Sequence, residues 1–213
     1  MKIKLEKVVN LELIRIYKIF TWLLLISVFL TPFFAYYNFH PLASFFYNAF
    51  AFFDHQYPYR SYALFPATNE IGNCIQQNDS YVFTFYTKIF TKPYNGTFVY
   101  DRKDIGSIRA EICTKKLNNE VIIGYKFPVC ARDIGIYLGM ALTTLLISGK
   151  RKRDKKILDE IQPIYVFFLF IPMAFDGFGQ LAGFWESTNE LRLLTGTLSG
   201  VAVSLIMMKV FYE

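Results

Sequence analysis

Residues 17–37 form an apolar run, YKIFTWLLLISVFLTPFFAYY, in which Lys18 is the only charged side chain. An α-helix rises about 1.5 Å per residue, so about 20 apolar residues cross the hydrocarbon core of a bilayer. The run is therefore long enough to be a membrane span. A secretory signal peptide is the alternative, but it fits poorly because the run is too long and no small-residue cleavage site follows it.

Three further apolar runs occupy residues 134–148, 163–184 and 193–212. The first of these reaches spanning length only if its helix begins within residues 127–133. The whole chain is 54% apolar and 19% charged, which is less charge than soluble domains carry. We therefore predict an all-α membrane fold, a four-helix transmembrane bundle in a lipid bilayer.

Basic residues cluster beside these runs. Five precede or begin the first run, and the segment KRKRDKK (150–156) lies between the second and the third. Cytoplasmic segments carry such clusters, so we expect a multi-pass protein of the cell membrane with both termini in the cytoplasm. The net charge of +6 could also suggest nucleic acid. No basic stripe carries interleaved stacking aromatics, however, and we expect no nucleic-acid partner.

The chain between the first two runs is expected to lie outside the cell. Residues 41–53 are too short to cross and rich in aromatics, which predicts an interfacial or re-entrant helix. Three segments then have the composition of strands: SYVFTFYTKIF, NGTFVY and EVIIGYKF. We therefore expect three parts: residues 1–61 with the first span and the interfacial helix, an extracytoplasmic β-rich insertion at 62–127, and a three-helix transmembrane core at 128–213.

Two kinds of covalent modification suit an external location of this insertion. Asn78 and Asn95 each begin an N-x-S/T glycosylation acceptor. Cys74 and Cys113 lie in the same segment, where an oxidising exterior would favour a disulfide between them. Two free, buried thiols are the alternative.

Polar residues recur at the outer ends of the later runs. Asp176 and Gln180 are four residues apart and would share one face of a helix, while Arg132 and Arg192 lie just before the second and fourth runs. Ionisable groups inside a bilayer suggest a site that faces the bundle interior. The alternative is a structural kink in which Asp176 pairs with one of the two arginines. Because of Pro172 and the glycines after it, we expect the third helix to be kinked or broken near Asp176.

Small-residue motifs indicate how the helices would pack. Pairs of glycines four residues apart allow helices to approach closely in lipid, and they favour a compact three-helix core with the first span outside it. The sequence STNE (187–190) also predicts a capping box at the start of the fourth helix. The three glycine pairs are Gly135 and Gly139, Gly179 and Gly183, and Gly196 and Gly200.

Four segments around these residues read DHQYPYRS, CARDIGIYLG, DGFGQ and STNELRLLTG. Together they resemble the pattern of a family of predicted membrane proteins, domain of unknown function 2085. That pattern runs Cys-His-Gln with a nearby Arg-Ser, Cys-Ala-Arg-Cys-x-Gly-Ile-Tyr, Asp-Gly-x-x-Gln and Arg-Leu-Leu-Thr-Gly. The resemblance implies an archaeal-like or other prokaryotic membrane protein with a shared polar site. It implies no particular reaction.

The chain departs from this pattern at two of three cysteines, where it carries Asp54 and Asp133. With only Cys130 left, a CxxC disulfide exchange is excluded at this site. Zinc accepts carboxylate, imidazole and thiolate, so a mixed zinc site remains open. Its candidate ligands are Asp54, His55, Cys130 and Asp133. Alternatively, the two aspartates form salt bridges with Arg60 and Arg132.

Two functions fit these observations. In the first, the chain is an enzyme of the outer leaflet that acts on a lipid or a lipid-linked anionic group. Its candidate catalytic residues are Asp176 as acid or base, Gln180 beside it, and Arg132 and Arg192 as holders of the head group. In the second, the chain is a non-catalytic subunit or scaffold of a membrane protein complex. Small-solute transport is weaker, since the inward halves of the spans carry no polar residues.

Overall fold

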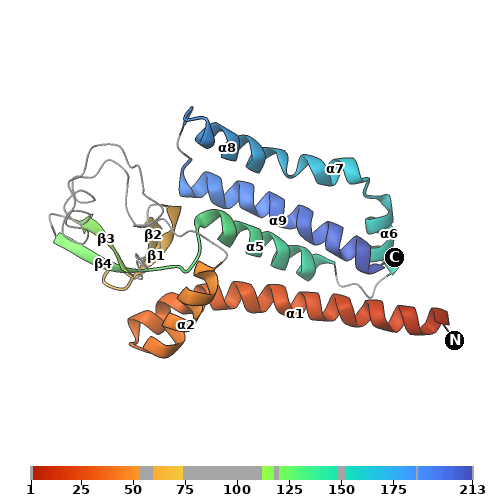
Figure 1. Cartoon of the computed structure of the whole chain (residues 1–213), viewed down its shortest axis with the longest axis horizontal. Helices are drawn as coiled ribbons and strands as arrows, with labels where there is room; N and C mark the ends of the chain where they lie inside the picture. Colours follow the sequence, from red (N-terminus) through yellow and green to blue (C-terminus); the bar gives the residue numbers. More distant parts are fainter. Residues whose placement is uncertain are drawn as a thin grey trace. The chain divides into compact units, whose positions relative to one another are not determined.

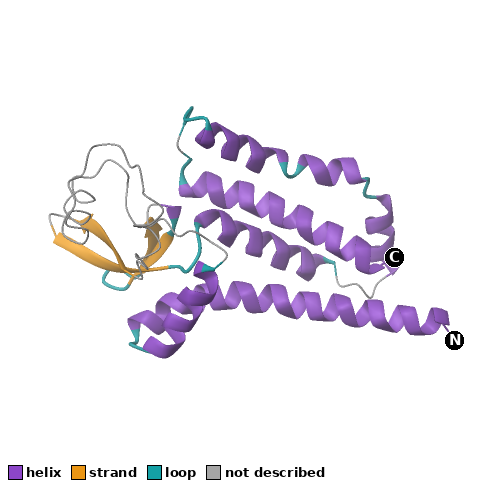
Figure 2. Ribbon diagram, viewed as in Figure 1, coloured by secondary structure: helices purple, strands orange, loops and turns teal. Residues whose placement is uncertain are grey.

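The computed structural model describes residues 2–52, 60–73, 112–117, 120–147, 152–185 and 187–212. It is mostly helical, with one small sheet (Figures 1 and 2). The helices are α1 (Lys2–Tyr36), α2 (His40–Ala51), α5 (Ala131–Leu146), α6 (Lys152–Glu160), α7 (Pro163–Phe168), α8 (Ile171–Leu181) and α9 (Asn189–Tyr212). The strands are β1 (Tyr62–Phe65), β2 (Glu70–Asn73), β3 (Ile112–Leu117) and β4 (Glu120–Lys126).

The chain divides into two compact units. The first comprises Met1–Ser27 and Ala131–Glu213, and the second comprises Val28–Cys130. We call them the helical unit and the sheet unit. The predicted three-part division of the chain remains a prediction.

Three helical stretches among the described residues are long and apolar enough to span a membrane: Glu12–Tyr36, Pro163–Leu181 and Asn189–Phe211. They coincide with the first, third and fourth predicted runs. The second run forms α5, which has 16 residues. At about 24 Å it is shorter than the hydrocarbon core. The structure therefore supports three spans, and a four-helix transmembrane bundle is not confirmed.

Helices α5 and α9 form the closest helix pair of the helical unit, with α9 between α5 and the α7–α8 pair (Figure 1). The two helices run parallel, because residues further along α5 contact residues further along α9. A Cβ added to Gly196 would overlap the carbonyl oxygen of Arg132, and one added to Gly200 would overlap that of Ile136. Gly135 and Gly139 meet the α9 backbone in the same way. Both predicted motifs therefore allow backbone contact, as small residues do in lipid.

The third predicted span is broken at Leu169 and Phe170, between α7 and α8. Pro172 follows at the start of α8, where its missing N–H is tolerated. In a continuous helix its ring would clash with the carbonyl of Phe168 one turn earlier. Helix α8 then continues without interruption past Asp176. The prediction of a break near Asp176 was wrong in position, because a proline disturbs the turn that precedes it.

The end of α8 differs from the predicted packing motif. Gly183 lies beyond the helix with φ +75°, and the N–H of Phe184 donates to the carbonyl of Gly179 at 2.9 Å. This is a Schellman cap, which needs a left-handed residue. A Cβ added to Gly179 would overlap the ring of Trp185. The pair Gly179 and Gly183 therefore makes a cap and a ring contact, rather than a contact between two helices.

A buried hydrophobic cluster holds the helices together at the end of the helical unit that lies opposite Gly183. It contains Ile14 and Tyr17 of α1, Met140 of α5, Leu158 of α6 and Met208 of α9. The N-terminal part of α1 thus belongs to the helical core rather than lying outside it. It also follows that α6 lies near the C-terminal end of α9.

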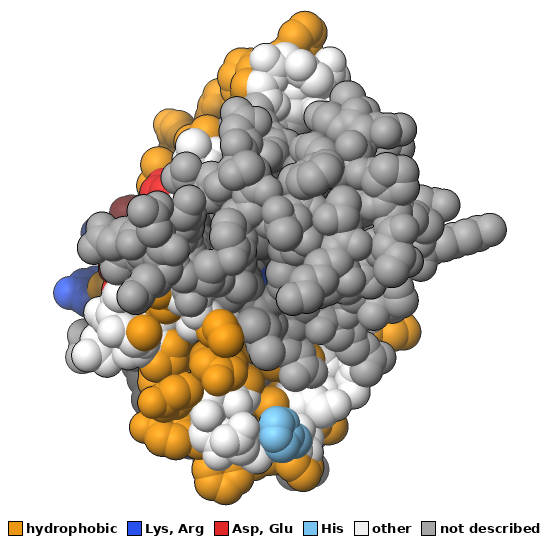
Figure 3. Space-filling view, turned by 90° about the vertical axis from the view of Figure 1, so that its left-hand side faces the viewer, with side chains coloured by type: hydrophobic (Ala, Val, Ile, Leu, Met, Phe, Trp, Pro, Cys, Tyr) orange, Lys and Arg blue, Asp and Glu red, His pale blue; other side chains and the backbone are white. Residues whose placement is uncertain are grey.

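The sheet unit contains an antiparallel four-stranded sheet in the order β2-β1-β4-β3. Strand β4 confirms the predicted strand EVIIGYKF, while the other two predicted strands lie outside the described residues. Helix α2 confirms a helix at 41–53. The Tyr47 hydroxyl of α2 donates to the Lys126 carbonyl of β4 at 2.5 Å, whereas Phe45 on α2 is 62% exposed. Hydrophobic side chains are likewise exposed on part of the face in Figure 3.

Candidate functional site

Asp176 is the centre of a polar network inside the helical unit. Its side chain is 3% exposed, and its Oδ2 accepts a hydrogen bond from Arg132 Nη2 at 2.6 Å. Gln180 Nε2 donates to the same oxygen at 2.9 Å, since one helical turn separates the two residues. The pair of Asp176 with Arg132, one of the sequence alternatives, is therefore present.

A second arm connects α9 to the same carboxylate. Arg192 is 2% exposed, and its Nη2 donates to Gln180 Oε1 at 2.8 Å. Its Nη1 donates to Asn189 Oδ1 at 3.4 Å, one turn earlier on α9. The amide of Gln180 thus bridges Asp176 to Arg192 by donating from nitrogen and accepting at oxygen. All four predicted catalytic residues meet in one network.

Trp185 is a member of this network that the sequence did not indicate. Its Nε1 donates to Asp176 Oδ1 at 3.4 Å, and its ring covers the position where Gly179 has no Cβ. A buried indole N–H usually finds an acceptor. The sequence shows only that an aromatic residue follows a glycine at the end of a helix. This pattern does not predict that the chain folds back onto α8.

Helix α9 begins one residue later than predicted, because the predicted capping box would make Ser187 the cap. The Leu191 N–H donates to Thr188 Oγ1 at 3.3 Å, and the Arg192 N–H donates to the Thr188 carbonyl at 3.0 Å. Thr188 is therefore the cap, and the third helical residue is Leu191, which cannot complete a capping box. This start places Asn189 and Arg192 on the same face, toward Gln180.

Arg132 differs from Arg192 in having donors to spare. Its side chain is 26% exposed, and among the described residues Asp176 is its one hydrogen-bond partner. Its Nε is buried and has no partner there. A guanidinium has five N–H donors, and buried donors in proteins are normally satisfied. The exposed part of this side chain can therefore bind a further acceptor.

The predicted zinc ligands are only half described. Cys130 is half-buried and directly precedes α5, and Asp133 lies in the first turn of that helix. Asp54 and His55 lie outside the described residues. Among those that are described, no group of three His, Cys, Asp or Glu side chains could hold a metal. Zinc binding therefore remains a prediction.

The predicted modifications fall in the same gap. Asn78, Asn95 and Cys74 lie outside the described residues. Cys113 lies in β3, where the structure describes the backbone. The glycans and the disulfide therefore remain predictions as well.

Comparison with known proteins places the network in a family. A model of predicted membrane proteins, DUF2085, matches residues 113–206, a range that includes all four network residues predicted from the sequence. An uncharacterised protein of Methanocaldococcus jannaschii is 33% identical over 138 residues, which cover 61% of this chain and 86% of that protein. An uncharacterised protein of Methanothermobacter thermautotrophicus is 38% identical over 86 residues, 39% of this chain and 71% of that protein.

No solved structure is a significant match to the chain. The family model confirms the family read from the sequence, and its range includes three of the four sequence segments but not DHQYPYRS. By these matches, and by its three helices of spanning length, the chain belongs to the DUF2085 family of predicted membrane proteins.

Proposed function

We propose that this chain is a four-span protein of the cell membrane whose polar network binds the anionic head group of a lipid or lipid-linked molecule at the outer leaflet. The observation that carries this proposal is the Arg132 guanidinium. It donates one hydrogen bond to Asp176, and the Arg132 side chain is 26% exposed. Guanidinium binds phosphate and carboxylate through paired donors, and this one is already oriented by a buried carboxylate.

The direction of the helices supports the topology of this proposal. Because α5 and α9 run parallel, both would leave the network toward the same side of the membrane. The basic segment 150–156 and the C-terminus would then share the cytoplasmic side, as their charge requires. In this arrangement α5 is the fourth span, lengthened at its ends by flanking residues.

The network also supports separate roles for Asp176 and Arg132. Asp176 accepts hydrogen bonds from Arg132, Gln180 and Trp185, which hold its carboxylate in one orientation. Its first role in the proposal is therefore to position Arg132 for the head group. A role in proton transfer is the enzymatic form of the same proposal, in which Arg132 and Arg192 hold the substrate.

The test is an analysis of the molecules that copurify with the full chain in mild detergent. An Arg132→Gln variant removes the binding charge, whereas Arg15→Gln removes a charge that pairs with Glu12 on the surface of α1. We expect an anionic lipid or lipid-linked molecule with the unaltered chain and with Arg15→Gln, and its loss with Arg132→Gln. The same set of molecules in all three preparations would contradict the proposal.

The enzymatic form has its own test. Once the bound molecule is identified, its conversion is followed with the unaltered chain and with Asp176→Asn, which keeps the shape of the side chain. We expect conversion to stop while binding and folding persist. A fully active Asp176→Asn variant would remove Asp176 from the chemistry.

A scaffold role is the second candidate, and the closed geometry around Asp176 favours it. The bond from Arg132 to Asp176 joins α5 to α8, and the bond from Arg192 to Gln180 joins α9 to α8, so the network can simply lock the three helices together. A partner protein copurifying in a fixed ratio, without any bound anionic molecule, would support this candidate over the first.

A further inference from the structure

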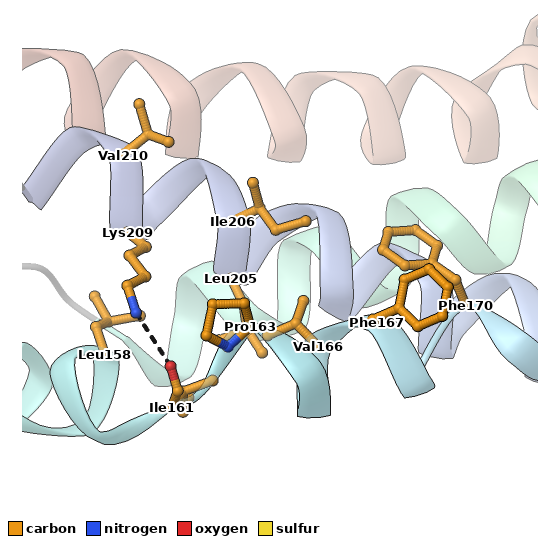
Figure 4. A pocket seen from close by; sticks show the side chains of 10 residues that line it. All are labelled: Leu158, Ile161, Pro163, Val166, Phe167, Phe170, Leu205, Ile206, Lys209 and Val210. Atoms are coloured by element: carbon orange, nitrogen blue, oxygen red, sulfur yellow. Dashed lines mark hydrogen bonds between the residues drawn. The ribbon is translucent and has the colours of Figure 1, made fainter.

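A groove lies at the opposite end of α9 from the polar network (Figure 4). Its volume is about 390 Å³, and its walls come from α7 and α9, with the end of α6 closing one side. Pro163, Val166 and Phe167 line it from α7, and Leu205 and Ile206 from α9. Every lining side chain is apolar except that of Lys209.

Lys209 provides the one charged group of this groove. Its Nζ donates to the Ile161 carbonyl at 3.1 Å, which fixes the ammonium beside the apolar walls (Figure 4). An ammonium has three donors, so two remain for another acceptor. Among the described residues, no carboxylate forms an ion pair with this nitrogen. The charge is therefore both positioned and available.

The position of Lys209 along α9 matches a membrane interface. It lies 17 residues after Arg192, and the intervening residues of α9 carry no charge. That separation is about 25 Å along a helix, about 5 Å less than the hydrocarbon core, and the long side chain of a lysine can cover this difference by extending toward the head groups. If Arg192 lies near one surface of the membrane, the groove lies at acyl-chain depth and the ammonium of Lys209 reaches the head groups of the opposite leaflet.

Basic residues dominate the segment that leads into the groove, and Asp159 and Glu160 follow at its end. The segment 150–156 has six basic residues and one acidic residue. Within α6, Arg153, Lys155 and Lys156 are exposed, whereas Leu158 is 1% exposed and packs into the core. Helix α6 is therefore amphipathic, as helices that lie in a membrane interface are. Such basic interfacial segments attract anionic lipids.

We propose that this groove binds an anionic phospholipid, with an acyl chain against Val166 and Ile206 and the phosphate on the Nζ of Lys209. Both walls belong to stretches of spanning length, so the groove is within reach of membrane lipid. A partner helix is the less suitable occupant. Close helix contacts in lipid use small residues, whereas large side chains such as Phe167 and Ile206 line this groove.

The test is native mass spectrometry of the full chain in detergent, titrated with phosphatidylglycerol or with phosphatidylcholine of the same acyl chains. We expect the unaltered chain to bind one phosphatidylglycerol molecule at least tenfold more tightly than phosphatidylcholine. Lys209→Met, which keeps the length of the side chain, should lose this preference, and Lys209→Arg should retain it. Arg15→Gln removes an exposed basic residue that pairs with Glu12 on the surface of α1, outside the groove, and should change nothing.

A second pair of variants tests the groove independently of its charge. Ile206→Trp fills the groove and should weaken the binding of both lipids about tenfold. Leu194→Trp adds the same bulk to an exposed position of α9 outside the groove and should have no effect. Equal binding of the two lipids by the unaltered chain would overturn the proposal. So would full lipid preference in Lys209→Met, or unchanged binding in Ile206→Trp.

This proposal and the outer-leaflet proposal can fail separately. Arg132→Gln leaves the groove intact, so it should not alter the phosphatidylglycerol preference. If the preference disappears with Arg132→Gln and persists with Lys209→Met, the anionic lipid binds at the polar network and the groove proposal is overturned.

Discussion

Asp176 accepts hydrogen bonds from three side chains while 3% of its own side chain is exposed. A carboxylate in this position is stable only because its partners replace water. The cost of breaking a buried ion pair comes from the charge that is left behind. The partners of Asp176 are therefore as important to stability as Asp176 itself.

Asp176→Ala should lower the free energy of unfolding by about 2 to 4 kcal/mol, because Arg132 keeps a charge without its carboxylate. The partial exposure of Arg132 keeps the loss at the lower part of this range. Unfolding in mixed micelles measures it, with Asp159→Ala on exposed α6 as the control. The double variant Arg132→Met, Asp176→Leu should recover part of the loss. Wild-type stability in Asp176→Ala would show that the network is not a lock.

Gly183 provides a second test of stability, in which the substitution changes only the backbone conformational energy and no packing contact. Its φ is +75°, and a Cβ added there would meet no atom within 4 Å. Gly183→Val should therefore cost about 1 to 2 kcal/mol of unfolding free energy through conformation only, and Gly183→Asn should cost less. Thermal unfolding in detergent distinguishes the two. Equal melting temperatures for both variants would contradict the proposed origin of the cost.

At this scale the sequence predicts pairs within one helix better than pairs between segments. Asp176 and Gln180 are four residues apart, and helical periodicity alone puts them on one face. Arg132 was one of two possible partners, and the choice needed the tertiary structure. Trp185 was not predicted, because its position depends on the left-handed turn at Gly183.

Among the elements, α5 and α9 are the best-determined pair, since glycines on both helices allow their backbones to touch. The spacing of these glycines predicted the contact. The spacing does not give the direction of the helices, because a small-residue motif is compatible with either one; the parallel direction follows instead from the predicted four-span topology, in which the second and fourth spans cross the membrane the same way. Likewise, Pro172 predicted a break in the third span, while the turn that breaks is the preceding one at Leu169 and Phe170.

Gly200→Ala and Gly177→Ala form a matched pair of variants. The added methyl at Gly200 would overlap the Ile136 carbonyl, whereas at Gly177 it would meet nothing within 4 Å. Gly200→Ala should cost about 1 to 3 kcal/mol of unfolding free energy through overpacking. Gly177→Ala should leave stability unchanged or raise it by up to about 1 kcal/mol. Unfolding in mixed micelles compares them, and a stable Gly200→Ala variant would mean that the two backbones can separate freely.

For the whole molecule, charge and helix direction lead to one orientation. The polar network lies at one end of the helical unit, and α6 lies at the other with the C-terminal end of α9. In the proposed topology, the basic segment 150–156 lies on the cytoplasmic side. Composition and run length were sufficient to predict a membrane protein. Sequence patterns did not decide whether the short α5 spans the membrane. The predicted strands between β2 and β3 lie outside the described residues.

Cysteine labelling in intact cells tests this orientation. Ala67 in the β1–β2 turn and Lys155 in α6 are both exposed. With a membrane-impermeant maleimide, Ala67→Cys should be labelled from outside above the level of the unaltered chain. Lys155→Cys should be labelled only after the membrane is opened. Labelling of Lys155→Cys in intact cells would reverse the proposed topology.

The parallel arrangement of α5 and α9 also constrains how the protein is made. Two parallel neighbours cannot be joined by a tight hairpin, so α7 and α8 must return the chain across the bilayer before α9 can dock. Until the ribosome has delivered α9, the glycine face of α5 has no helix to cover it. The contact between α5 and α9 therefore forms only after α9, the last of the described helices, has been synthesised, and a nascent chain that ends before α9 lacks it.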